Sequence, residues 1–323
     1  MEFENEKVDV KENTIYKIDN DLLSILLSDH SSRKNIIWGT DNYSKRGFGY
    51  NFNDELTVYN IVGRNGKIIR PRIKKSKLEQ TKRSKDMAEV FTPSWLCNEQ
   101  NNIIDECWFG YSNVFNESIN ESWITNLNQI NFLNNSWKEY VLLKRLEVSC
   151  GEAPYLVSRY DTTSGDVLDI INRIGLLDRK LRIINENVNN EDEWIVWAQK
   201  AYESIYAFEW QGDSLLIARE NLLYTYIDYY SYKFNKNPSV DVLKKIADII
   251  SWNIVQMDGL KGTIPNSCKN ETIVNNTLFG EEIIKTECEG CCKNNIKKHN
   301  GIYVYIMDWE LGRKVKFISL LSK

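Results

Sequence analysis

Histidine and proline are scarce in this chain, and long apolar runs are missing. The two histidines, His30 and His299, lie near opposite ends, so the sequence gives no support for a nucleophile paired with a histidine base. No run of about 18 apolar residues occurs. The opening residues, MEFENEKVDVKEN, are acidic and have no apolar core. We therefore expect neither a membrane span nor a signal peptide, and the expected location is the cytoplasm.

Cysteine is present in an odd number, seven, which favours reduced thiols or metal ligands over disulfides in a chain without an export signal. The segment CEGCC places Cys288 and Cys291 with two residues between them, a spacing that lets both thiolates face one ion. With Cys268 and His299 they predict a structural zinc site, in which Cys292 is a substitute for the histidine. The alternative is a group of ordinary reduced cysteines in a polar loop.

Positive charge is concentrated in one stretch, 64–85. It holds ten Lys or Arg and one acid, a net +9; since the whole chain carries −4, the remainder carries −13. Clustered cations bind nucleic acid by releasing condensed counterions, so Arg70, Arg72, Lys74 and Lys75, the densest part, are candidate DNA contacts. The alternative is a solvated linker.

Apolar spacing predicts helices over 94–109, 191–208, 214–232 and 240–254. Strand-like pieces interrupt the polar N-terminal part at LTVYNIVG and KIIRPRI, and 301–321 is typical of a β-hairpin with its turn near Gly312. Strands separated by helices favour an α/β protein with a parallel sheet. We expect four parts: an irregular N-terminal region with a basic arm (1–86), a ligand-binding domain (87–265), a cysteine-rich insert (266–300) and the hairpin (301–323).

The stretch LEVSCGEAPYL, 146–156, has the form of a strand that ends at a bound small molecule. Its turn, Cys150-Gly151, lets the backbone approach a ligand closely. Three other segments accompany it in the chain: AEVFTPSWL, YAFEWQGDSLLIARENLL, in which Glu209 ends an apolar run, and SWNIVQMDGL, in which Asp258 follows another. In parallel sheets, ligands bind beyond the carboxyl ends of the strands.

In this order the segments resemble the gamma-type DNA adenine-N6 methyltransferases, a family that includes the modification (M) subunits of restriction-modification systems. That family shows Phe-Thr-Pro and then Leu-Asp-Pro-Ala-Cys-Gly-Ser-Gly-x-Phe-Leu. Leu146, Cys150 and Gly151 match the second motif, and Glu147 stands for its aspartate. Glu152 replaces the serine that follows, and the second glycine is absent. The resemblance covers about 88–260 and implies a partial Rossmann-like sheet of the S-adenosylmethionine-dependent methyltransferases, with a helical segment before it.

The resemblance also implies a cofactor, S-adenosyl-L-methionine, and residues that hold it. The turn would approach the amino-acid end of the cofactor, and Thr92 and Pro93 would close over it. Glu209 would accept hydrogen bonds from the ribose hydroxyls, and Asp258 would bind the adenine amino group. The implied set is Thr92, Pro93, Glu147, Cys150, Gly151, Glu152, Glu209 and Asp258. The alternatives are capping acids at Glu209 and Asp213 and a turn residue at Asp258.

One family motif is missing: an Asn or Asp followed by Pro-Pro and an aromatic residue, which performs the chemistry on the flipped base. None of the five prolines are adjacent, so no catalytic residue is predicted. We expect the cofactor-binding part of a split DNA adenine methyltransferase of a restriction-modification or phage-defence system, with the Asn-Pro-Pro-aromatic motif on a second subunit. That subunit would pair with the open edge of the first strand, unless the C-terminal hairpin covers it. Alternatives are a non-catalytic DNA-binding or sensor subunit and a free-standing nucleic-acid binder.

Overall fold

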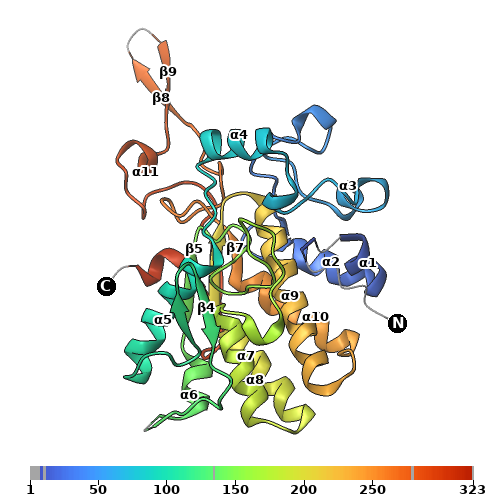
Figure 1. The fold of residues 1–323 in the computed structure, drawn as a ribbon. Coiled ribbons are helices and arrows are strands. Elements are labelled where there is room, and N and C mark those ends of the chain that lie inside the picture. Colours follow the sequence, from blue (N-terminus) through green and yellow to red (C-terminus); the bar gives the residue numbers. More distant parts are fainter. Residues whose placement is uncertain (1–7, 10–11, 134, 278–279, 322–323) are drawn as a thin grey trace.

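A three-stranded parallel sheet lies at the centre of the computed structural model, which describes residues 8–9, 12–133, 135–277 and 280–321. Its strands are ordered β5 (Arg145–Val148), β6 (Ile205–Glu209) and β7 (Ile254–Gln256). Two helices connect each pair of strands: α7 (Leu176–Asn187) and α8 (Glu191–Glu203), then α9 (Gly212–Phe234) and α10 (Val240–Asn253) (Figure 1). The chain is therefore a mixed α/β protein with a parallel sheet, as its sequence predicts.

The two faces of the sheet are covered by different parts of the chain, because successive strand residues point to opposite sides. Ala207 and Ile254 are buried in the main apolar core with the connecting helices. Phe208 points the other way and is buried in a second cluster with Ile306 and Phe317 from the C-terminal part. The ring centroids of Phe208 and Phe317 lie 5.7 Å apart. The C-terminal part thus covers one face of β6.

The predicted C-terminal hairpin is present: β10 (Tyr305–Asp308) pairs antiparallel with β11 (Arg313–Lys316). It forms its own two-stranded sheet and does not extend the central one. Within the described ranges β5 pairs only with β6. Leu146 and Val148 on β5 are 49% and 62% exposed. One edge of β5 is therefore without a strand partner in the described part of the chain.

The N-terminal region contains more helix than its sequence suggests. α1 (Glu12–Ile18) and α2 (Asn20–Leu27) pack together, and α2 contacts α10 and α9. The piece LTVYNIVG, predicted as a strand, instead forms α3 (Val58–Ile61), which begins where the Thr57 hydroxyl accepts a hydrogen bond from the Asn60 N–H at 3.3 Å. That prediction was wrong. KIIRPRI is also not a strand; its only regular part is a 3₁₀ turn at Arg72–Lys74.

The helix predicted over 191–208 is also corrected, since it ends at Glu203 and β6 begins at Ile205. Between them lies Ser204, the C-cap residue of α8, whose hydroxyl donates to the carbonyls of Val141 (2.9 Å) and Ala201 (2.8 Å). The remaining elements before β5 are β1 (Ser28–Asp29), β2 (Lys34–Asn35), α4 (Lys77–Met87), α5 (Ser94–Phe109), β3 (Asn116–Ile119), β4 (Ser122–Thr125) and α6 (Trp137–Leu142). None of the helices in the described ranges is both long and apolar enough to cross a membrane.

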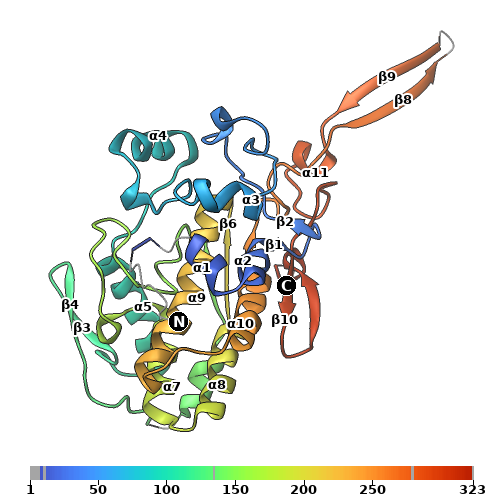
Figure 2. The same cartoon turned by 90° about the vertical axis from the view of Figure 1, so that its right-hand side faces the viewer.

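A two-stranded arm that the sequence did not indicate rises from the cysteine-rich segment. β8 (Glu271–Thr277) and β9 (Gly280–Thr286) pair antiparallel and project away from the rest of the molecule in both views (Figures 1 and 2). The short helix α11 (Glu289–Cys292) follows β9. The cysteines of this segment lie at the base of the arm.

Candidate functional site

A cavity of about 860 Å³ opens at the carboxyl ends of β5 and β6. Three stretches of the chain form its wall: residues 85–92, 147–151 and 209–211, together with Phe52, Pro154, Tyr155 and Ser214. This is where a parallel sheet is expected to bind a ligand, and the volume lies within the range of small-molecule sites, roughly 300–1,000 Å³.

A direct contact joins the ends of the two strands. The Gly151 N–H donates to one carboxylate oxygen of Glu209 at 2.9 Å, and the Gln211 N–H donates to the other at 3.1 Å. Gly151 has a φ of +54°, and a Cβ there would lie 3.3 Å from the ring of Phe91. Glycine therefore suits both the backbone conformation and the close approach of the ring. Burial raises the pKa of Glu209 above its usual value.

Glu147 and Cys150 complete the inner wall. The Glu147 carboxylate accepts hydrogen bonds from the N–H groups of Tyr155 (3.3 Å) and Leu156 (3.2 Å), which ties the turn after β5 back to the strand. Burial raises the pKa of Glu147 to about 8. Burial also raises the pKa of the Cys150 thiol well above its usual value, so this cysteine packs as a neutral group.

Of the eight predicted cofactor residues, the structure brings five to the cavity wall: Thr92, Glu147, Cys150, Gly151 and Glu209. The other three do not line it. Pro93 is the N-cap residue of α5. Glu152 is buried, and its carboxylate accepts from the Arg72 N–H and the Tyr160 hydroxyl, both at 2.6 Å.

Asp258 also lies away from the wall and closes a turn. Its carboxylate accepts from the N–H groups of Leu260 at 3.0 Å and Lys261 at 3.2 Å. Asp258 therefore has the geometry of a turn residue, which was the alternative to its predicted role in binding adenine.

The basic stretch is largely folded into the protein. Lys75 is buried against Asp213 at 3.4 Å, and Arg72 pairs with Glu89 at 3.3 Å. Arg70 pairs with Glu79 at 3.3 Å. Of the four candidate DNA contacts, Lys74 alone is exposed. Most of the predicted set thus has an internal partner.

Asp213, which the sequence indicates only as a capping acid, is the centre of a buried charge network. Its carboxylate is fully buried and meets the Arg83 guanidinium at 2.8 Å and the Tyr43 hydroxyl at 2.8 Å. Arg83 also bonds Glu89, which belongs to the cavity wall. Burial would raise the pKa of Asp213, but Arg83 and Lys75 outweigh it and hold this pKa below its usual value. These ion pairs hold residues 75–89 against the start of α9.

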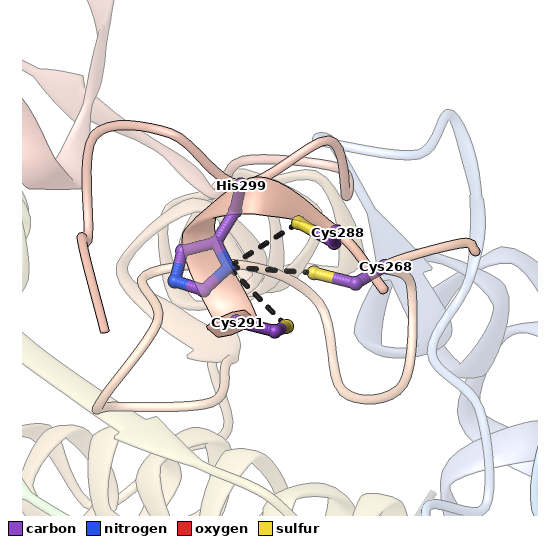
Figure 3. A group of neighbouring side chains, drawn as sticks. All are labelled: Cys268, Cys288, Cys291 and His299. Atoms are coloured by element: carbon purple, nitrogen blue, oxygen red, sulfur yellow. Dashed lines mark hydrogen bonds between the residues drawn. The ribbon is translucent and has the colours of Figure 1, made fainter. Parts of the chain in front are cut away.

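The predicted metal ligands come together at the base of the arm. The Nδ1 atom of His299 lies 3.6 Å from the Sγ of Cys268, 3.8 Å from that of Cys288 and 3.6 Å from that of Cys291 (Figure 3). All four ligand atoms lie within 4.8 Å of one another. Cys292, considered as a substitute for the histidine, is exposed and directs its Sγ to the Glu287 carbonyl at 3.7 Å.

These distances fit a tetrahedral ion. Zinc binds sulfur at about 2.3 Å and nitrogen at about 2.0–2.1 Å, which places tetrahedral S and N ligands roughly 3.6 Å apart. The surroundings hold the ligands in place: the Asn300 N–H donates to the Cys288 Sγ at 3.2 Å, and the His299 N–H donates to the Tyr303 hydroxyl at 2.9 Å. The group is therefore a Cys3His arrangement that could hold a metal ion.

Several residues of the cavity wall were not predicted from the sequence. Phe52 and Trp210 lie edge to face with their ring centroids 6.4 Å apart, and Phe91 packs on the glycine turn. Phe91 could have been found from the Phe-Thr-Pro segment, whereas nothing in the local pattern marks Phe52.

Comparison with protein-family models, with curated proteins and with solved structures finds no match to this chain.

Proposed function

We propose that the cavity beside β5 and β6 binds S-adenosyl-L-methionine and that the chain is the cofactor-binding part of a split DNA adenine-N6 methyltransferase. The observation that carries the proposal is the hydrogen bond from the Gly151 N–H to the Glu209 carboxylate, at the carboxyl ends of two adjacent parallel strands. The resemblance of the sequence to the methyltransferases predicts a glycine turn after one strand and an acid after the next, and in this chain the two lie side by side at one cavity. A partial Rossmann-like sheet belongs to the same proposal.

The wall residues fit the parts of this cofactor. Each oxygen of Glu209 accepts one backbone N–H and keeps a second lone pair, which is available to a ribose hydroxyl. The turn at Cys150 and Gly151 offers backbone groups to the amino-acid end, and the rings of Phe52 and Trp210 offer apolar surface to the adenine. The cofactor supplies a methyl group on a cationic sulfonium.

A second subunit is part of the proposal, because this sequence has no Asn-Pro-Pro-aromatic motif. The unpaired edge of β5 and the exposed side chains of Leu146 and Val148 offer a place for its strand. A strand there would end beside the same cavity and bring its following loop to the cofactor.

We expect Glu209→Ala to weaken S-adenosylmethionine binding more than Cys150→Ala does. The first change removes charge-assisted hydrogen bonds of about 1.5–3 kcal/mol each, whereas Cys150 contributes mainly packing. Calorimetric titration of the assembled complex measures both, and a thermal melt of each variant checks its folding. Small and equal effects of the two changes would count against the cavity as the cofactor site.

Methyl transfer is expected only from the assembled enzyme. The chain should be produced with and without the product of its neighbouring reading frame, and adenine methylation of DNA should be assayed for each. Robust methyl transfer by the isolated monomer would refute the split-enzyme proposal. Cofactor binding without methyl transfer in any assembly would favour a non-catalytic DNA-binding or sensor subunit with the same fold.

We also propose that the Cys3His group binds a structural zinc ion. Three thiolates and one imidazole leave no open coordination position on a tetrahedral ion, which is typical of structural zinc sites and not of catalytic ones.

A further inference from the structure

The side chain of Phe48 is 101% exposed, whereas the other aromatic residues of segment 38–50 are buried. Trp38, Tyr43 and Tyr50 are each no more than 9% exposed, and the Trp38 ring lies 4.5 Å from that of Tyr43 and 5.5 Å from that of Tyr50. The segment thus places three aromatic rings in the core and one entirely in solvent.

Two glycines with positive φ flank Phe48 in the loop formed by residues 44–50, which we call the Phe48 loop. Gly47 has φ 94° and ψ −149°, a region that glycine alone adopts readily, and Gly49 has φ 84°. The Gly49 carbonyl accepts from the Trp38 indole N–H at 3.0 Å and from the Asn60 amide at 2.8 Å. The base of the loop is therefore fixed to the core while its tip points outward.

Positive charge lies close to Phe48 in the sequence and on a neighbouring helix. Lys45 and Arg46 directly precede the first glycine and are exposed. The blue loop before α3 lies beside α4 in both views, and α4 exposes Lys77, Lys82 and Lys85 (Figures 1 and 2). These cations are distinct from the internally paired Arg72 and Lys75.

The loop and α4 both lead to the cavity. Lys85, at the C-terminal end of α4, lines its wall, and so does Phe52, four residues after Phe48. The segment after the loop and the end of α4 thus both contribute to the wall of the cavity.

We propose that the Phe48 loop is a nucleic-acid contact, in which the ring of Phe48 stacks on a base and Lys45 and Arg46 meet the flanking phosphates. The exposed lysines of α4 continue this track to the cavity. The inference rests on the proposed function only in taking DNA as the partner.

The composition of the loop favours nucleic acid over a protein partner. A stable protein interface buries roughly 800 Å² on each side around an apolar centre, whereas the neighbours of Phe48 are glycines and cations. Nucleic-acid surfaces combine cations for the backbone with single aromatic rings that stack on bases or insert between them.

The test is binding of the full-length chain to fluorescein-labelled single-stranded and duplex DNA of one sequence, followed by anisotropy over a series of salt concentrations. We expect Phe48→Ala to weaken binding to single-stranded DNA about 5- to 100-fold and Phe48→Tyr to restore it. With 2-aminopurine in the DNA, the fluorescence change on binding should be smaller for Phe48→Ala. The matched control is Leu127→Ala, which removes another side chain that is 76% exposed, on the segment after β4.

Replacement of both Lys45 and Arg46 by alanine should reduce the salt dependence by about 0.7–0.9 in log–log slope for each lost phosphate contact. The proposal is overturned if the wild-type chain binds no DNA, if Phe48→Ala binds as the wild type does, or if Phe48→Ala disturbs only the complex with a protein partner. Cofactor titration of the assembled complex separates the two ideas: DNA binding that depends on Phe48, without S-adenosylmethionine binding in the assembled complex, would contradict the proposed function and leave this inference standing.

Discussion

Replacement of Cys288 by serine is expected to abolish metal binding. The wild-type chain should contain close to one zinc ion, because three sulfur atoms and one nitrogen already lie at distances that suit a tetrahedral ion. Cys288 is buried among the other ligands, so no solvent-exposed group readily takes the place of its thiolate. Elemental analysis of the purified variant should therefore show well under one zinc per chain.

Cys292, the residue after Cys291 at the end of α11, provides a matched control. Cys292→Ser removes a thiol adjacent to Cys291 but outside the ligand group, so its zinc content should equal that of the wild type. Structural zinc contributes roughly 10–16 kcal/mol of binding free energy in small zinc domains, and we expect limited proteolysis to cut the cysteine-rich segment of Cys288→Ser first. A wild-type protein without zinc, or a Cys288→Ser protein that keeps it, would disprove the zinc proposal.

Arg83→Met should destabilise the protein by about 3–5 kcal/mol, because it leaves the buried carboxylates of Asp213 and Glu89 without their shared cation. Methionine keeps much of the volume and removes the charge. The free energy of unfolding in urea measures the effect. Lys82→Met is the control, since it removes a cation from the exposed side of the same helix, and its stability should change by less than about 0.5 kcal/mol.

The same network predicts an acid dependence of stability. Asp213 has a lower pKa in the folded protein than in the unfolded chain, so its contribution is complete above the unfolded value of about 3.9 and is lost as the pH falls below it. In Arg83→Met this loss between neutral and acidic pH should be smaller. An Arg83→Met protein as stable as the wild type at neutral pH would show that the network contributes little.

Local spacing was enough to predict the metal ligands, because Cys288, Cys291 and His299 lie within twelve positions of one another and only Cys268 comes from farther away. The strand ends near Glu147 and at Glu209 were also readable, since each lies in a short strand-like run before a turn. The sequence could therefore indicate where the cavity lies.

The basic stretch shows why the rest could not be predicted. Arg83 and Lys75 meet Asp213 across 130 and 138 positions of sequence, and nothing local tells which cations of a run turn inward. The same holds for LTVYNIVG, whose β-branched residues favour a strand, while the cap at Thr57 and the surrounding core select a helical turn. Long-range partners decided both outcomes.

The arm has a consequence for how this protein can be altered. Its first and last residues, Glu271 and Thr286, are paired with each other, and Cys268 and Cys288 stand just outside these two ends. We therefore expect the ends to stay where they are when the length of the arm is changed. The entropic cost of such a change grows slowly, by about 0.6 kcal/mol for each doubling of loop length. The arm is accordingly the place in this fold for inserting a reporter domain or an affinity tag without disturbing the sheet or its cavity.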